Sequence, residues 1–347
     1  MKLLIITQKV DKNDPILGFF HRWIVEFAKN VESVIVITLE KGEYDLPENV
    51  RVFSLGKEKK KSRLKYLFRF YSYIWRERKN YDAVFVHMNP IYVIFGGLFW
   101  KLWHKKISLW YTHKKVDMKL RIAEKMTDVI FSASKESFRL SSRKLIITGH
   151  GIDTEIFKPL PKIKSDCIRL ATIGRITETK NLSFIVDVFE IFKNNLAQKT
   201  IIKIIGRTMS SLDENYKKNL SEKISNLNLS HTVSFAPSVA NETLPELFRE
   251  IDATINVSAT GSTDKAVLES MSCGVPVFTT NEAFRDTLGP LGFYVPFKSP
   301  NNLALVMSLY FARGLDMSKE LRLIVLENHS LKALVPKIIS QLRDSAI

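Results

Sequence analysis

Short apolar runs alternate with helix-like segments along most of the chain, and this alternation limits the possible folds more than any other feature. The first half contains KLLIIT, SVIVIT, RVFSL, DAVFVH, ISLWYT, DVIFSA and KLIIT, and the second half contains IRLATIG, TIIKIIG, TVSFA, DATINV and VPVFTT. Amphipathic segments such as FFHRWIVEFAKN and LSFIVDVFEIFKNN lie between these runs. Nearly continuous apolar strands that alternate with helices are typical of parallel sheets covered on both faces. The sequence therefore predicts an α/β fold.

The chain has 347 residues, too many for one ordinary hydrophobic core. The alternation pauses once, at FKPLPKIKSD (residues 157–166), which has two prolines and no hydrophobic period and so indicates a linker. We therefore predict two doubly wound, Rossmann-like domains, residues 1–160 and residues 161–330. Because such sheets bind ligands beyond the carboxyl ends of their strands, the expected site is a cleft between the two domains.

Cysteine usage and hydropathy indicate the compartment. Cys167 and Cys273 are the only cysteines, which excludes a disulfide framework and a Cys/His metal motif and favours a reducing compartment, the cytoplasm. The start MKLLIITQKV lacks the flanks of a signal peptide. The longest apolar run, IYVIFGGLFW (residues 91–100), is shorter than the ~20 residues of a membrane-spanning helix.

The net charge of +16 is concentrated in the first half, where residues 1–160 carry 30 Lys and Arg against 17 Asp and Glu. A basic half usually binds a polyanion, either nucleic acid or an anionic membrane surface. Because no nucleic-acid-recognition motif is present, we predict no nucleic-acid partner and a peripheral position on the inner face of the plasma membrane.

The stretch KEKKKSRLKYLFRFYSYIWRERK (residues 57–79) has the pattern of a basic amphipathic helix in a lipid interface. The predicted apolar face consists of Leu64, Leu67, Phe68, Tyr71, Ile74 and Trp75. Tyr66, Phe70 and Tyr73 are expected to widen the aromatic surface. A helix packed on its own sheet with a solvated basic side would explain the apolar face equally well.

The first motif with chemical content is ATIGRITETKNLSFIVDVF (residues 171–189). Gly174 ends an apolar strand, Arg175 follows it, and Lys180 comes just before a helix. The free N–H groups and the dipole of a helix N-terminus favour anions, and two cations beside it strengthen that preference. The motif predicts an anion site, with a solvated basic loop as the alternative.

The second motif is GSTDKAVLESMSCGVPVF (residues 261–278), a loop, a helix and a strand. Ser262, Thr263 and Asp264 are all good N-cap residues, although one of them would suffice for capping. Glu269 follows in the second helical turn, where it could bind a ligand hydroxyl, as acids bind ribose in nucleotide folds. The alternative is a surface glutamate on an ordinary helix.

Three further residues come from the first domain. His150 lies in GHGIDTEIFKP, a glycine-flanked turn before the linker, and Gly18 ends the long first β–α loop, residues 8–23. We include both among the residues predicted to bind a ligand. His113 follows a strand and is predicted to have a direct chemical role. The absence of GxGxxG in that loop disfavours a dinucleotide cofactor.

Taken together, HGIDTEIFKP, IGRITETKNLSFIV and GSTDKAVLESMSCGVPVFTTN resemble, in order and spacing, the motifs of family 4 glycosyltransferases with the GT-B fold. The resemblance is strong over residues 145–290 and looser over the first domain. It implies two facing Rossmann-like domains and a C-terminal helix, residues 331–347, that packs back on the first. It also implies sugar transfer from a nucleotide-sugar, such as a UDP- or GDP-sugar, with retention of anomeric configuration and without a metal or other cofactor.

The resemblance also implies roles for individual residues. Arg175 and Lys180 would hold the donor diphosphate, and Glu269, the second acid of the family's E-x7-E motif, would bind the ribose. The amides around residues 262–264 would meet the phosphate or the sugar. His113 would lie near the transferred sugar.

The chain departs from the family pattern at Gly261, where the first acid of E-x7-E would fall. Either Asp264 or Lys265 takes its place from a shifted loop, or the sugar is recognised differently. The leading prediction is a retaining, metal-independent glycosyltransferase with a lipid-linked or other saccharide acceptor, acting in surface polysaccharide or glycoconjugate assembly. The alternative, which Gly261 favours, is a non-catalytic GT-B partner subunit that binds sugar nucleotide or glycan.

Overall fold

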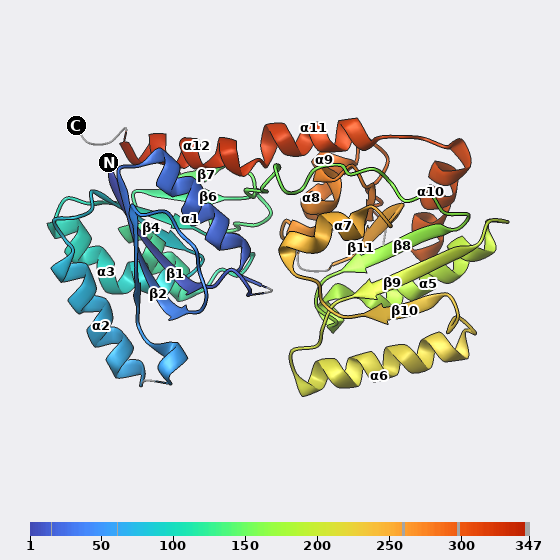
Figure 1. Cartoon of the computed structure of the whole chain (residues 1–347), viewed down its shortest axis with the longest axis horizontal. Coiled ribbons are helices and arrows are strands. Elements are labelled where there is room, and N and C mark those ends of the chain that lie inside the picture. The colour runs from blue at the N-terminus through green and yellow to red at the C-terminus, as the bar shows by residue number, and fades with distance from the viewer. Residues whose placement is uncertain (15, 61, 259–260, 297–298, 344–347) are drawn as a thin grey trace. The chain divides into compact units, whose positions relative to one another are not determined.

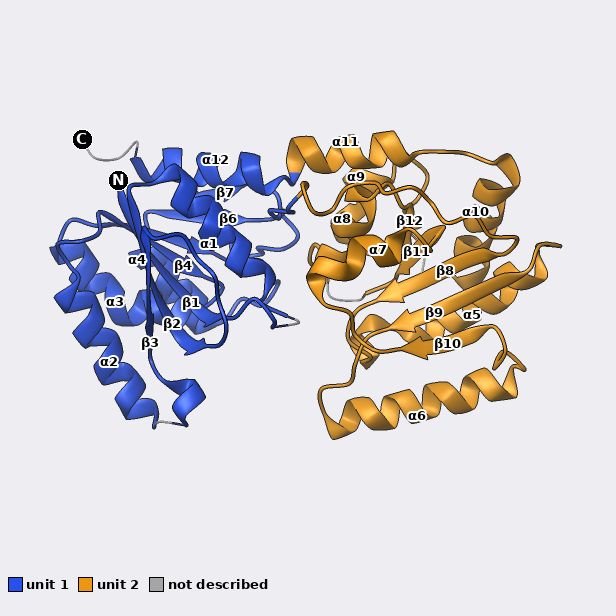
Figure 2. Ribbon diagram, viewed as in Figure 1, with its two compact units in different colours: residues 1–153, 329–347 blue, residues 154–328 orange. Residues whose placement is uncertain are grey.

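The computed structural model describes residues 1–14, 16–60, 62–258, 261–296 and 299–343. The chain forms two compact units, coloured separately in Figure 2. Unit 1 consists of residues 1–153 and 329–347, and unit 2 of residues 154–328. Each unit is a parallel sheet with helices packed on it (Figure 1), so the predicted α/β class is confirmed.

The sheet of unit 1 has the strand order β3-β2-β1-β4-β5-β6-β7, and its neighbouring strands pair in parallel. The strands are β1 (Lys2–Val10), β2 (Ser33–Lys41), β3 (Val50–Ser54), β4 (Ala83–His87), β5 (Lys106–Trp110), β6 (Val129–Ser132) and β7 (Leu145–Ile147). The order of strands reverses between β1 and β4, so the loops after these two strands leave in opposite directions from one point of the sheet's carboxyl edge, where its strands end.

Each face of this sheet has its own core, because side chains alternate along a strand. Leu3 and Ile5 point to the side covered by α1 (Phe19–Asn30) and α12 (Leu331–Arg343). Leu4 and Ile6 point to the opposite side, which is covered by α2 (Arg63–Arg76), α3 (Pro90–Leu102) and α4 (Met118–Met126). The last helix of the chain therefore belongs to the core of unit 1.

Helix α2 packs on the sheet, and Ile74, which the sequence assigned to the lipid-facing side, is buried there. Phe70 and Ile74 are buried, whereas Leu64, Phe68 and Trp75 are 79%, 76% and 54% exposed. The prediction that Phe70 adds to an exposed aromatic surface was wrong. Because α2 is apolar around most of its circumference, periodicity alone could not show which side contacts the sheet.

The sheet of unit 2 has the parallel order β10-β9-β8-β11-β12. Its strands are β8 (Ile168–Ile173), β9 (Thr200–Ile205), β10 (Val233–Ala236), β11 (Ala253–Asn256) and β12 (Val277–Thr279). Its α-helices are α5 (Leu182–Asn194), α6 (Ser211–Asn226), α7 (Leu244–Phe248), α8 (Lys265–Ser272), α9 (Arg285–Leu288), α10 (Pro300–Arg313) and α11 (Ser318–Asn328). Short 3-10 helices are η1 (Lys57–Lys59) in unit 1 and η2 (Glu178–Lys180), η3 (Asn241–Thr243) and η4 (Glu282–Phe284) in unit 2.

The segment 157–166 contains no helix or strand and packs on unit 2. Lys162 Nζ donates to Phe248 O at 3.0 Å, and Arg249 Nε donates to Pro161 O at 3.0 Å. None of the described helices is long and apolar enough to cross a membrane.

Candidate functional site

The candidate site of unit 2 lies where the order of its strands reverses, between β8 and β11. These two strands are direct neighbours, and the chain proceeds from β8 to β9 on one side and reaches β11 on the other. In a doubly wound sheet, ligands bind outside the carboxyl ends of the strands at such a point. The predicted motifs at residues 171–189 and 261–278 supply the loops that follow β8 and β11.

Gly174, Arg175 and Lys180 form the loop after β8. Gly174 has a φ of +146°, and a Cβ built there would lie 3.1 Å from Lys180 Cε, so the absent side chain leaves room for the lysine. Arg175 is exposed and has no ion pair or hydrogen bond from its side chain to any part of the chain that the structure describes. The loop therefore offers one cation that is available to a ligand and one that is already engaged.

Lys180 is engaged by Asp264, the N-cap residue of α8. Lys180 Nζ forms an ion pair with Asp264 Oδ2, and Asn256 Nδ2 at the end of β11 donates to the same oxygen at 2.9 Å. Burial alone would raise the pKa of Asp264, but the charge of Lys180 and these hydrogen bonds outweigh it and hold that pKa below its usual range. The acid is thus ionised and holds Lys180 at the entrance of α8.

Glu269 lies one turn inside α8 and is only 3% exposed, so the surface alternative for this residue was wrong. Lys265 Nζ and Asn241 Nδ2 donate to its Oε1, at 2.6 Å and 2.7 Å. Its other oxygen, Oε2, has no hydrogen-bond partner among the described residues. Lys265 also lies over the ring of Phe157, 5.8 Å from the centroid. The carboxylate is therefore fixed in place with one oxygen left for a ligand hydroxyl.

The loop in front of α8 packs closely on the end of β12. Thr263 is buried, and Asn281 Nδ2 donates to Ser262 O at 3.1 Å. Gly261 has a left-handed φ of +60°. Both candidates for the missing first acid are already paired, Asp264 with Lys180 and Lys265 with Glu269.

Sequence reasoning missed two amides of this site. Asn256 ends β11 and holds Asp264, and Asn241 in η3 holds Glu269. Asn256 Oδ1 is buried and has no partner in the part of the chain that the structure describes. A polar residue at the end of DATINV was the available signal for Asn256, because the neighbouring β8 also has its predicted site residues at that edge. No local pattern predicted the role of Asn241, because Asn241 and Glu269 are 28 residues apart in the sequence.

The other predicted residues, Gly18, His113 and His150, belong to unit 1. His113 follows β5 and is exposed, and its Nδ1 accepts a hydrogen bond from Lys115 N at 3.0 Å. His150 is buried, and its ring centroid lies 6.5 Å from that of Trp110. The chemical roles of these two histidines stay predictions.

A third histidine, His87, is the buried end of β4. Its ring stacks on Phe20 with centroids 3.9 Å apart, and its Nδ1 lies 3.2 Å from Thr7 Oγ1. Burial, followed by the neighbouring His150, lowers the pKa of His87 to about 3, so this ring is neutral at physiological pH. The sequence did not distinguish it from an ordinary strand residue.

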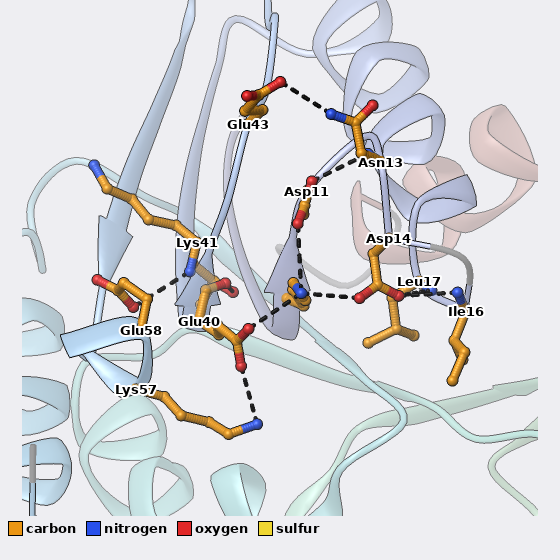
Figure 3. A network of polar contacts seen from close by, with 12 residues as sticks. Asp11, Asn13, Asp14, Ile16, Leu17, Glu40, Lys41, Glu43, Lys57 and Glu58 are labelled. Atoms are coloured by element: carbon orange, nitrogen blue, oxygen red, sulfur yellow. Dashed lines mark hydrogen bonds and ion pairs between the residues drawn. The ribbon is translucent and has the colours of Figure 1, made fainter. Parts of the chain in front are cut away.

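Gly18 ends a loop that is held by a network of charged residues at β1 and β2 (Figure 3). A Cβ at Gly18 would lie 2.5 Å from Asp14 O, so only glycine fits this close approach. Lys9 Nζ contacts Asp14 at 2.9 Å and Glu40 at 3.1 Å, and Lys57 contacts Glu40 at 3.0 Å. These contacts raise the pKa of Lys9, with the bond to Asp14 contributing most. The loop is therefore fixed by its own ion pairs.

No group of three or more His, Cys, Asp or Glu residues that could hold a metal ion occurs within the described ranges. That the reaction needs no metal ion stays a prediction.

Part of the chain matches known proteins in sequence. Residues 153–309 match the family model of the glycosyl transferases group 1. Mannosylfructose-phosphate synthase of Agrobacterium fabrum (strain C58) is 21% identical over 178 residues, 48% of this chain and 38% of that protein. The chain thus matches well under half the length of this relative.

Solved structures resemble the whole chain. The HepE protein of Anabaena in complex with UDP has a TM-score of 0.78 at 15% identity, covering 99% of this chain and 100% of that one. Sucrose-phosphate synthase from Thermosynechococcus elongatus has a TM-score of 0.77 at 13% identity, covering 99% of both chains. At such identities the likeness establishes the fold, which is GT-B. Residues 153–309, less than half of the chain, match the family model of the group 1 glycosyl transferases.

Proposed function

We propose that this protein is a retaining glycosyltransferase that moves a sugar from a nucleotide-sugar to a saccharide acceptor without a metal ion. The observation that carries the proposal is the meeting of Lys180, Asp264 and α8 at the reversal point of unit 2, within the segment that matches the family. The UDP complex of the Anabaena HepE protein supports a nucleotide as the donor group.

Each donor group has a matching partner in unit 2. Arg175, which has no ion pair within the described residues, would bind the diphosphate together with Lys180, which Asp264 holds at the entrance of α8. The free N–H groups at the N-terminus of α8 also favour an anion there. Glu269 Oε2 would accept a hydrogen bond from a ribose hydroxyl. Asp264 and Lys265 remain the candidates for contact with the donor sugar.

The reaction breaks the bond between the anomeric carbon and the β-phosphate oxygen. The acceptor hydroxyl forms its new bond to the same face of that carbon, and its proton passes to the departing phosphate oxygen. The leaving nucleoside diphosphate gains negative charge as the bond breaks, and fixed cations at α8 stabilise that charge in the transition state. No enzyme nucleophile is needed for this course.

The acceptor is proposed to be a lipid-linked saccharide in surface polysaccharide or glycoconjugate assembly, reached at the cytoplasmic face of the plasma membrane. Exposed cations surround the start of α2, namely Lys59, Lys60, Arg63 and Lys65, and Lys61 lies outside the described residues. Leu64, Phe68 and Trp75 expose apolar side chains on the same helix. This combination favours binding to an anionic bilayer, to which each cation contributes ~1 kcal/mol.

The donor proposal is tested by thermal shift with UDP-, GDP- and TDP-sugars, followed by turnover of the sugar that stabilises the protein most. Turnover should persist in EDTA. Loss of turnover in EDTA that Mn²⁺ restores would contradict the metal-independent mechanism. Stabilisation by a nucleotide-sugar without any turnover would favour the non-catalytic partner subunit.

The membrane proposal is tested by co-sedimentation with anionic and neutral vesicles at low and high salt. Binding should require anionic lipid and fall with salt. Replacement of Lys59, Lys60, Lys61, Arg63 and Lys65 by Gln should release the protein without changing donor binding. Equal pelleting with both kinds of vesicle would rule out an electrostatic attachment.

A further inference from the structure

Unit 1 contains a groove that the donor chemistry does not use. Its volume is about 590 Å³, and its walls are mostly apolar, formed by Leu39, Leu55, Leu64, Leu67, Phe70 and Phe95 among others. The groove lies at the first turns of α2 and α3, which Figure 1 shows side by side and which contact each other through Tyr71 and Phe99. The volume falls within the range of ~300–1,000 Å³ for small-molecule sites.

One end of the groove lies at the reversal point of the sheet. Gln8 near the end of β1 and Asn89, the N-cap residue of α3 two positions after β4, line this end, and both are polar and uncharged. Ligands of doubly wound sheets bind at this place. The groove therefore joins an apolar channel to a position where a polar ligand group is expected.

The mouth of the groove favours an anion. Arg63 lines it, and the N-termini of α2 and α3 open toward the same carboxyl edge, so their dipoles add positive potential. Glu40, which follows the lining residue Leu39, is already paired with Lys9 and Lys57. Leu64, which also lines the groove, is 79% exposed, so its apolar surface faces water until something covers it.

We propose that this groove binds the hydrocarbon chain of an amphiphile with a phosphate head group, the tail between α2 and α3 and the head at Arg63. The inference rests on the proposed function, because it identifies the acceptor as a phosphate-linked lipid. A concave apolar channel with one cationic rim fits a single chain with an anionic head. Phe68 and Trp75 are exposed but do not line the groove, so they are not part of this site.

The test is calorimetric titration of the whole protein with octyl, decyl and dodecyl phosphate below their critical micelle concentrations. Each methylene buried in the groove should tighten binding about fourfold. Leu64→Glu places a charge on the rim without disturbing the core. It should lower the affinity for dodecyl phosphate at least tenfold. Leu67→Trp fills the groove and should make the affinity independent of chain length.

Leu98→Glu is the matched control, because Leu98 is an exposed leucine of α3 that does not line the groove. It should bind all three phosphates as the wild type does. Equal losses in Leu64→Glu and Leu98→Glu, or no loss in either, would overturn the groove as the binding site. Equal affinity for dodecyltrimethylammonium would overturn the anionic head group.

Stabilisation by nucleotide-sugar is measured on the same variants. If the affinity for alkyl phosphates depends on chain length but no nucleotide binds, the groove proposal stands and the proposed donor chemistry is refuted. If nucleotide binds but the affinity for alkyl phosphates does not depend on chain length, only the groove proposal is refuted.

Discussion

The two units have the same kind of sheet, with one reversal of strand order, but different groups at the reversal point. In unit 2 this point holds two ion pairs, Lys180 with Asp264 and Lys265 with Glu269. In unit 1 it holds the apolar groove and the neutral ring of His87. The two reversal points are therefore alike in backbone architecture, and the side chains that follow the strands make them chemically different.

One cluster of charged residues in unit 1 lies at β1 and β2, on one side of the reversal point. Lys9, Asp14 and Glu40 tie the first loop to β1 and β2 and leave the groove uncharged except at Arg63. Charged residues thus form ion pairs at the reversal point of unit 2, and in unit 1 they fix a loop.

The largest expected effect is at the charged edge of unit 2. Lys180→Ala should lower turnover by about 10²–10³-fold, because it removes one fixed cation from the departing diphosphate. Steady-state assays with the donor identified by thermal shift measure this, and circular dichroism checks the fold.

The control is Lys203→Ala, which removes another ion-paired lysine of unit 2, bound to Glu250 at 3.4 Å. It should leave turnover unchanged. Equal losses in the two variants would mean that Lys180 acts through stability rather than through the donor.

The next effect is at Glu269. Glu269→Ala should weaken nucleoside diphosphate binding by about 1.5–3 kcal/mol, the range for a hydrogen bond to a charged group. Titration calorimetry with UDP and GDP measures it. Glu250→Ala, an exposed glutamate of the same unit, is the control. An unchanged affinity of Glu269→Ala for UDP and GDP would show that Glu269 does not bind the ribose.

The smallest expected effect is a loss of folding stability at acid pH, caused by the buried neutral ring of His87 in unit 1. The pKa of His87 is about 3 in the folded protein and about 6.5 when unfolded, so the unfolded state takes up the proton first as pH falls. Stability should therefore decrease below about pH 6.5, by about 2 kcal/mol at pH 5 through His87 alone. Asp264 in unit 2 has a lowered pKa, so its contribution is lost only at more acid pH, below its ordinary value of 3.8.

Tryptophan fluorescence reports on unit 1 alone, because the five tryptophans, at positions 23, 75, 100, 103 and 110, all lie in it. Urea unfolding followed this way at about pH 8 and about pH 5 measures the difference. His87→Asn should reduce the pH dependence, whereas His104→Asn, at an exposed position with a φ of +52°, should keep it. The same pH dependence in both variants would show that His87 is not the titrating group.

Much of the fold was predictable because it depends on local patterns. Apolar runs between helix-like segments indicated the parallel α/β architecture, and Gly174, Arg175 and Lys180 were recognisable after a strand. The packing side of α2 was not predictable, because Phe70 and Phe68 differ only in which of them meets the sheet.

The sequence by itself determined the two parallel sheets, the strand ends that carry the candidate site residues, and the match of residues 153–309 to a family model. These features depend on residue type and spacing along the chain. Only the tertiary structure decided that Asp264 binds Lys180, that Asn241 holds Glu269, and that α2 and α3 leave a groove between them. Such contacts join residues 28 to 84 positions apart, and their distances depend on how strands and helices pack, which no local pattern encodes.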